Sequence, residues 1–162
     1  MAIYNTSSDS ANTAVRALLT KIGEYYFGRS FNTGAGKSKR IWEKIRDEIF
    51  DGECAYCGDD KTKLQIEHLI MFNRAQFGLH HLGNIVPTCT SCNRRRKDTN
   101  NEYLNWEDHL KEICEESNNL KVFEYRKNKI LRHINEGEFK YPKLSKTENN
   151  AIKVISNSHT KI

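Results

Sequence analysis

Cys54-Ala-Tyr-Cys57 and Cys89-Thr-Ser-Cys92 are the two segments of the sequence that decide the fold. Each C-x-x-C pair can bring two thiolates onto one ion, and four thiolates complete the tetrahedral shell of a structural Zn²⁺. Such a shell has no open position, so this ion would stabilise the fold rather than react. Four unrelated buried cysteines, or a redox-active pair, would explain the doubled spacing less well. Cys114 has no partner at ligand spacing, so we expect it to pack in the core.

The composition is that of a basic chain of modest size. Of its 162 residues, 37% are apolar and 29% are charged, and the formal net charge is +5. This length suits one domain with short appendages, to whose stability a bound metal ion can contribute. The positive charge favours a polyanionic partner such as nucleic acid. No secretory signal and no membrane-spanning apolar run are evident, so we expect a cytoplasmic protein with reduced thiols.

Apolar residues recur at helical spacing on both sides of the segment that holds the cysteines. This periodicity predicts helices over residues 11–27, 37–50, 105–116, 120–134 and 149–155. Asp51-Gly52 would end the second helix, Asn105 would cap the third, and Ser145-Lys-Thr-Glu148 would form a capping box for the last.

These helices predict three parts of the chain. They are an N-terminal helical extension (1–52), a core with the four cysteines (53–99) and a C-terminal helical extension (100–162).

The core carries a second set of polar residues between and after the cysteine pairs. A short alternating strand over 64–66 ends in Glu67-His68, and a second apolar run over 84–88 leads into the second pair. Asn93 follows the last cysteine, and the basic run 94–97 is expected to start a helix. A hairpin followed by a helix, with zinc at its base, would bring Glu67, His68 and Asn93 together.

This order of motifs resembles the HNH, or ββα-metal, endonuclease family from Cys54 to about Asp98. The resemblance rests on C-x-x-C, Ile66-Glu67-His68-Leu69-Ile70, Gly83-Asn84-Ile85-Val86, and Cys89-x-x-Cys92-Asn93 with Lys97 four residues later. It implies an α+β fold, in which a zinc-stapled, treble-clef-like ββα-metal core lies between N- and C-terminal helices.

The resemblance also implies a role for each matching residue. His68 would be the general base that removes a proton from the attacking water. Glu67 and Asn93 would bind a catalytic divalent ion, and Asn84 would fix the loop that holds the histidine. Oxygen ligands of this kind suit Mg²⁺ or Mn²⁺, in contrast to the thiolates nearby. The family usually has aspartate at position 67 and often histidine at position 93, so the choice of metal stays open.

Basic residues near this site could contact the phosphates of a nucleic acid, or could lie on a solvated surface. The candidates for phosphate contact are Arg74, Arg94, Arg95, Arg96 and Lys97. A second basic cluster, formed by Lys37, Lys39 and Arg40, could extend the contact surface.

The sequence therefore predicts a metal-dependent endonuclease that hydrolyses double-stranded DNA, with restriction or anti-phage defence as its expected role. If one site per chain cuts both strands, the protein should form a homodimer or join a larger complex. Two alternatives stay open. One is a zinc-stapled nucleic-acid-binding module without catalysis, and the other is an HNH nuclease that acts on RNA.

Overall fold

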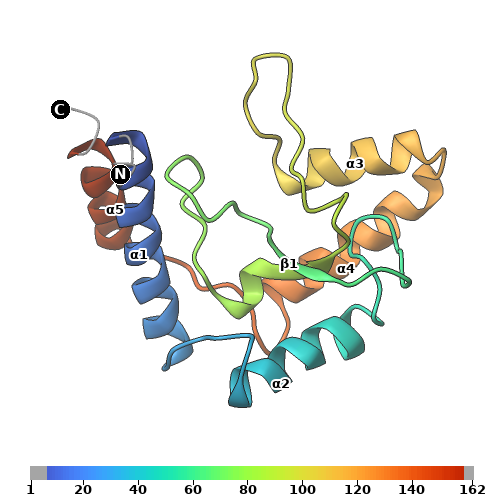
Figure 1. Ribbon diagram of the computed structural model, residues 1–162, viewed down its shortest axis with the longest axis horizontal. Helices are drawn as coiled ribbons and strands as arrows, with labels where there is room; N and C mark the ends of the chain where they lie inside the picture. Colours follow the sequence, from blue (N-terminus) through green and yellow to red (C-terminus); the bar gives the residue numbers. More distant parts are fainter. Residues whose placement is uncertain (1–6, 159–162) are drawn as a thin grey trace, which may run out of the picture. The chain divides into compact units, whose positions relative to one another are not determined.

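The computed structural model describes residues 7–158 (Figure 1). Its helices and strands are α1 (Ser7–Phe27), α2 (Gly36–Lys44), β1 (Gln65–His68), β2 (Ile85–Thr88), α3 (Trp106–Glu116), α4 (Phe123–Asn135) and α5 (Lys146–Ser158). A π-helical segment (Ile45–Ile49) continues α2, and short 3₁₀ turns cover Leu82–Asn84 and Leu120–Val122. This mixture of helices and a small sheet confirms the expected α+β class.

The described chain forms two compact units. One contains the chain up to residue 31, residues 70–81 and the chain from residue 142. The other contains residues 32–69 and 82–141, and so holds both cysteine pairs and both strands. The three-part division expected from the sequence stays a prediction.

The expected helix ends are confirmed where the sequence signal was strongest. Asp51 and Gly52, which follow the π-helical segment, have φ angles of 57° and 70°. This left-handed backbone ends a helix. Asn105 caps α3, because its side chain accepts a hydrogen bond from the backbone N–H of Asp108 at 2.9 Å.

In the first unit, α1 and α5 pack against each other, with Leu19 and Ile152 buried. Tyr26 on α1 donates its hydroxyl hydrogen to the carboxylate of Glu148 at 2.9 Å. The capping box is confirmed as well: the N–H of Ser145 donates to Glu148 at 2.7 Å, and the N–H of Glu148 donates to the Ser145 hydroxyl at 3.2 Å. These bonds fix the start of α5.

In the second unit, β1 and β2 form an antiparallel pair in which Gln65 lies opposite Thr88 and His68 opposite Ile85. The side chains of β2 are all buried. Such a small sheet is stable only when other elements cover it. From α4, the Nε2 atom of His133 lies 3.0 Å from the carbonyl oxygen of Ile85 and thereby holds β2 against the helix.

The helix expected over residues 94–97 is absent from the structure. Turns follow Cys92, and Lys97 pairs with Tyr103 in an isolated antiparallel bridge, so that the next helix is α3. The physical reason lies at Asp98, whose carboxylate accepts the backbone N–H groups of Asn100 and Glu102 at 2.8 and 2.9 Å. Such a side chain stabilises a turn at the expense of a helix.

Candidate active site and metal centre

The four cysteines of the two C-x-x-C pairs converge on one point. The sulfur atoms of Cys54, Cys57, Cys89 and Cys92 all lie within 4.8 Å of one another. The Cys57 and Cys89 sulfurs are 3.7 Å apart. Four sulfurs at about 2.3 Å from a tetrahedral Zn²⁺ would be about 3.8 Å apart, so the cluster fits this ion. The structure therefore supports the predicted structural zinc site.

Two features shape the first cysteine pair. Gly58 has a φ angle of 76°, a left-handed conformation that the turn after Cys57 requires and that glycine adopts without strain. Arg126 on α4 donates to the carbonyl oxygens of Tyr56 and Cys57 at 2.7 and 2.8 Å. Its positive charge would also favour four thiolates that hold a Zn²⁺ ion, because such a group is negative overall.

The second cysteine pair is held by His109 on α3. Its ring nitrogen Nε2 lies 2.9 Å from the carbonyl oxygen of Cys92, and Nδ1 accepts the backbone N–H of Arg96 at 3.4 Å. Nε2 is therefore the donor, and the imidazole is neutral. The desolvation that comes with burial lowers the pKa of His109, which keeps it in this form.

Glu67 forms a buried ion pair with Arg95. Its side chain is 11% exposed and that of Arg95 only 2%. Arg95 donates from Nη2 and Nε to a single carboxylate oxygen, Oε1, at 2.5 and 3.1 Å. Burial raises the pKa of Glu67, and the charge of Arg95 opposes that effect. Among the residues that the structure describes, none donates a hydrogen bond to the other oxygen, Oε2.

Arg95 also fixes the backbone around His68. Its Nη2 atom lies 3.0 Å from the carbonyl oxygen of His68 and 3.2 Å from that of Leu69, and Nη1 lies 3.3 Å from that of Leu104. These bonds occupy the guanidinium within the protein. Arg95 is thus an internal residue and not the surface cation that the sequence suggested.

Asn93 is held on the same face of the hairpin as Glu67. Its amide nitrogen Nδ2 donates to the side-chain oxygen of Gln65 at 2.8 Å. Gln65 and Glu67 are two residues apart on β1, so their side chains project from one face of the strand. The bond to Gln65 leaves the Oδ1 atom of Asn93 as a possible metal ligand.

His68 follows Glu67 on β1 and is half-buried. Because successive side chains of a strand alternate, it projects from the opposite face. Asn84 is fully buried, and its backbone oxygen accepts the N–H of Leu69 at 2.8 Å. The structure thus joins Asn84 to the residue after His68, while the catalytic roles of both stay predictions.

The chain segment that contains all these residues also has a counterpart among known protein families. Residues 54–99 match the model of the HNH endonuclease family. No curated protein and no solved structure matches the chain. The match confirms the resemblance over almost the same residues. It indicates a nuclease or nucleic-acid-binding function for residues 54–99, which we call the HNH segment. No helix within residues 7–158 is long and apolar enough to cross a membrane.

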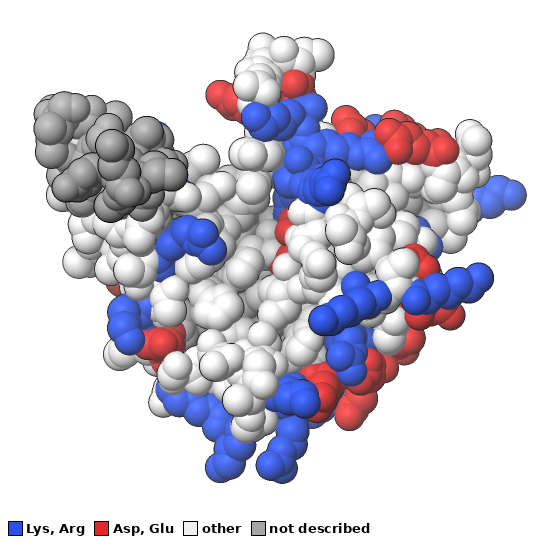
Figure 2. Space-filling model, in the orientation of Figure 1, with Lys and Arg blue, Asp and Glu red and all other residues white. Residues whose placement is uncertain are grey.

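The residues of the basic run 94–97 differ in their exposure and in their partners. Arg94 and Lys97 are exposed, while Arg96 is bound by both carboxylate oxygens of Glu116 at 2.5 Å. Figure 2 shows basic side chains gathered at the base of the loop that precedes α3. Arg74 lies in the other unit, where its N–H donates to the side chain of Asn12 at 3.3 Å.

The sequence did not predict a role in either site for Gln65, His109 or Arg126. The structure shows that these three residues hold the site residues in place. Gln65 lies 28 residues before Asn93, and Arg126 lies 70 residues after Tyr56. A periodic pattern relates only residues that are close along one helix or strand. The sequence therefore contains no signal that would have identified these partners.

Proposed function

We propose that the protein is a metal-dependent HNH endonuclease that hydrolyses DNA phosphodiester bonds, with Glu67 and Asn93 as ligands of a catalytic Mg²⁺ or Mn²⁺. One observation carries this proposal. Each of the two side chains has one atom held by the protein, Oε1 by Arg95 and Nδ2 by Gln65, and one oxygen without such a bond. Two hard oxygen ligands on one face suit an ion that keeps other positions for water and phosphate.

The ligand set fits the ion because the surrounding residues orient it. Carboxylates that bind a metal are commonly held by a further hydrogen bond, and Arg95 supplies one to Glu67. A bound ion would supply positive charge for a phosphate oxygen and for the leaving oxygen. The chain itself would bind and orient the phosphate group at the end of β1.

His68 is the general base in this proposal. A neutral imidazole can accept a proton from water near neutral pH. Glu67 and His68 project from opposite faces of β1, so a phosphodiester at the end of the strand would have the ion ligands on one side and the base on the other. This arrangement suits in-line attack. Arg95 and Asn84 hold the backbone of His68 and Leu69, and thereby the position of the base.

Phosphate contacts would come from the exposed Arg94 and Lys97, with Arg74 as a further candidate in the other unit. Arg96 would contact a phosphate only after leaving the carboxylate of Glu116. Such contacts position a nucleic acid without reading its sequence. Cleavage in this family implies products with a 5′ phosphate and a 3′ hydroxyl. We propose double-stranded DNA as substrate and restriction or anti-phage defence as role, with a dimer or larger complex where both strands are cut.

The test compares wild type, His68→Ala and Asn128→Ala on supercoiled plasmid, with and without Mg²⁺ or Mn²⁺. Asn128 is an exposed polar residue of α4 and serves as the control. We expect ion-dependent cleavage that falls at least about a hundredfold in His68→Ala and is retained in Asn128→Ala, at equal zinc content. Equal cleavage by all three proteins would contradict the proposal. A matching RNA substrate decides between the two polymers.

The buried Arg95–Glu67 pair specifically favours a second candidate, a zinc-stapled binding module without catalysis. A guanidinium already compensates the carboxylate, so Glu67 could serve the fold without an ion. Binding of Mn²⁺ to the zinc-loaded protein separates the two functions. The nuclease requires Mn²⁺ binding that is lost in Glu67→Gln, whereas the module binds nucleic acid equally well with and without the ion.

A further inference from the structure

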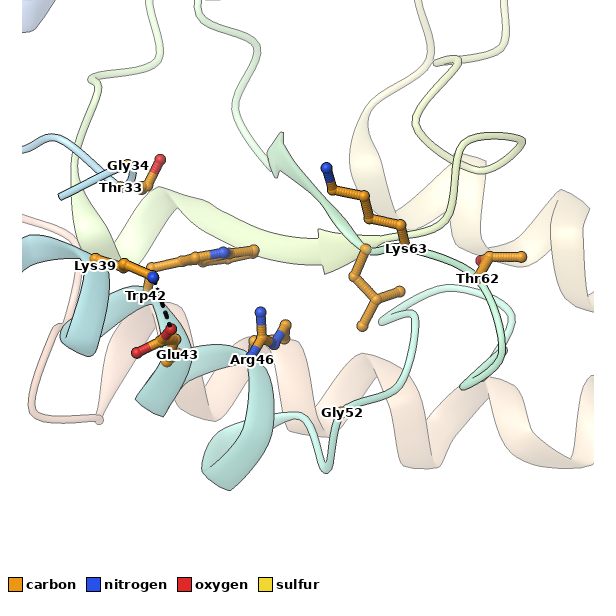
Figure 3. A pocket seen from close by; sticks show the side chains of 10 residues that line it. Thr33, Gly34, Lys39, Trp42, Glu43, Arg46, Gly52, Thr62 and Lys63 are labelled. Carbon is orange, nitrogen blue, oxygen red and sulfur yellow. Dashed lines mark ion pairs between the residues drawn. The ribbon is translucent and has the colours of Figure 1, made fainter.

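A depression of about 660 Å³ opens beside α2 in the unit that contains the HNH segment (Figure 3). The indole ring of Trp42 lies between the loop at Thr33 and Gly34 and the chain at Lys63. Trp42 packs on the core, with 8% of its surface exposed. Small-molecule sites typically enclose about 300–1,000 Å³, so the depression is large enough for a nucleotide.

The charges around the depression favour an anionic ligand. Its lining contains the cations of Lys39, Arg46 and Lys63 and one carboxylate, that of Glu43. Arg46 is already neutralised by Asp47, whose carboxylate oxygens lie 2.6 and 2.7 Å from it.

Lys39 and Lys63 keep their charge available. The Lys39 amine lies 3.8 Å from Glu43, and the two side chains are 55% and 39% exposed, so solvent weakens this contact. Lys63 is exposed, and the structure gives it no ion pair within the described chain. Figure 3 shows Lys39 and Lys63 on either side of the indole. One anionic group could therefore bind near the exposed part of the indole.

We propose that this depression binds one nucleotide of a nucleic-acid strand, with the face of its base against the exposed part of the Trp42 indole and its phosphate at Lys63. An aromatic side chain beside a cation is the combination by which proteins bind unpaired bases, and it tolerates any base because each has a π face. A base within a duplex is covered by its neighbours and reaches such a surface only when it leaves the stack. The site therefore selects an unpaired base.

The location relates this subsite to the proposed cleavage site, and this part of the inference rests on the proposed function. Leu64 directly precedes β1, and His68 ends it. At about 3.3 Å per residue, His68 lies about 13 Å further along the strand. Nucleotides follow one another at about 3.4 Å in a duplex, so the bound base lies a few positions from the bond to be cut. The preferred substrate then has an unpaired base a few positions from that bond.

The test uses the fluorescence of Trp42. The chain has two tryptophans, so Trp106→Phe leaves Trp42 as the only one. This protein, loaded with zinc and without other divalent ions, is titrated with a ten-nucleotide oligothymidylate, with a blunt duplex and with free thymidine monophosphate. We expect saturable quenching by the single strand and affinity at least about tenfold weaker for the duplex.

Lys63→Glu, made in the same background, should lower the affinity for the single strand at least about tenfold, because it replaces a phosphate contact by charge repulsion. Lys111→Glu on α3 makes the same charge change at another exposed lysine and should leave the affinity nearly unchanged at physiological salt. If Trp106→Phe loses zinc, the lysine variants are compared in the protein with both tryptophans.

Absence of quenching, equal affinity for the duplex, or an unchanged affinity of Lys63→Glu would overturn the nucleotide site. Equally tight binding of the monophosphate and the oligonucleotide would support the site and assign it to a free nucleotide. The readout needs no cleavage. A protein that binds but does not cut would contradict only the proposed nuclease function, and one that cuts without quenching would contradict only this subsite.

Discussion

Arg95, which follows the second cysteine pair, connects this part of the HNH segment to the hairpin that carries Glu67 and His68. Its guanidinium joins a carboxylate with backbone carbonyl groups from β1 and from the loop before α3. A buried ion pair adds little net stability when both partners are present, but loss of one partner leaves the other charge uncompensated. The side chain therefore acts on the site through position and through charge.

Arg95→Met should destabilise the protein by about 3–5 kcal/mol, because the Glu67 carboxylate loses its buried counter-ion. Arg95→Met combined with Glu67→Gln should recover part of this loss, since the second substitution removes the unpaired charge. Urea unfolding at neutral pH measures both variants against wild type. If Arg95→Met were as stable as wild type, the ion pair between Arg95 and Glu67 would not form in the folded protein.

Gln65→Leu tests the proposed orientation of Asn93. Gln65 is exposed, so this substitution should change the free energy of unfolding little. Loss of the hydrogen bond to Asn93 should nevertheless lower the affinity for Mn²⁺ about 10- to 100-fold, as expected for a residue that orients a metal ligand. Electron paramagnetic resonance of free Mn²⁺ measures the affinity, with Asn128→Leu as the matched control. Equal affinities of both variants would remove Gln65 from the proposed site.

Among the elements, β2 depends on α4. The Nε2 atom of His133 lies within hydrogen-bond distance of the carbonyl oxygens of Leu82 and Ile85, and the ring of Phe50 packs edge-on at 5.4 Å. Within the described chain, the other ring nitrogen, Nδ1, is buried without a hydrogen-bond partner. A proton placed there would be a buried charge with no partner, so the native contact requires the neutral ring.

This arrangement predicts a pH dependence of stability. Burial lowers the pKa of His133 in the folded protein, whereas the unfolded chain keeps a value near about 6.5. The unfolded state then binds the proton first, so the contribution of His133 is full above about pH 6.5 and falls as the pH drops below it. His133→Gln keeps a donor for the carbonyl groups and should reduce the loss of melting temperature between pH 7.5 and 5.5. An equal loss in both proteins would exclude His133 as the cause.

The stretch between Cys92 and α3 forms turns where the sequence predicted a helix. A run of arginine and lysine has high intrinsic helix propensity, which favoured a helix over 94–97. The turn at Asp98 and the left-handed φ angle of 65° at Asn101 interrupt it. The helix starts only where Asn105 caps α3. Propensity was therefore overruled by local side-chain hydrogen bonds, which begin just after the basic run.

At the scale of the whole molecule, a Zn²⁺ ion bound by the four cysteines would compensate for the small size of the sheet. The N–H of Ala55 donates to the carbonyl oxygen of Pro87 at 2.8 Å, so the first cysteine pair is bonded directly to β2. Two strands alone are marginally stable in water. A bound ion would join the two cysteine pairs, in which Cys57 and Cys89 are 32 residues apart. Its binding is therefore expected to contribute directly to folding.

Removal of zinc by a chelator should unfold the unit that contains the HNH segment, with a loss of helical circular dichroism that returns when Zn²⁺ is added. Cys89→Ser should lower the zinc content and the melting temperature in the same way, because one ligand of the tetrahedron is lost. Cys114→Ser is the matched control, since Cys114 is buried outside the cluster and should leave zinc bound. Zinc loss only in Cys114→Ser would refute this assignment of the ligands.

The sequence by itself determined the features that depend on residues close together in the chain. The spacing within each C-x-x-C pair, the alternation of β1, the periodicity of the helices and the caps at Asn105 and Ser145 all act over a few residues. Local geometry and propensity decide such features, so they can be read without a structure.

Only the tertiary structure decided which side chains meet across long separations. It paired Glu67 with Arg95 and Gln65 with Asn93, each 28 residues apart, and it placed Trp42 beside Lys63 in one depression. It also turned Arg95 inward, although its neighbour Arg94 is exposed. Such contacts follow from packing and from the need of buried charges for partners, and neither leaves a periodic pattern in the sequence.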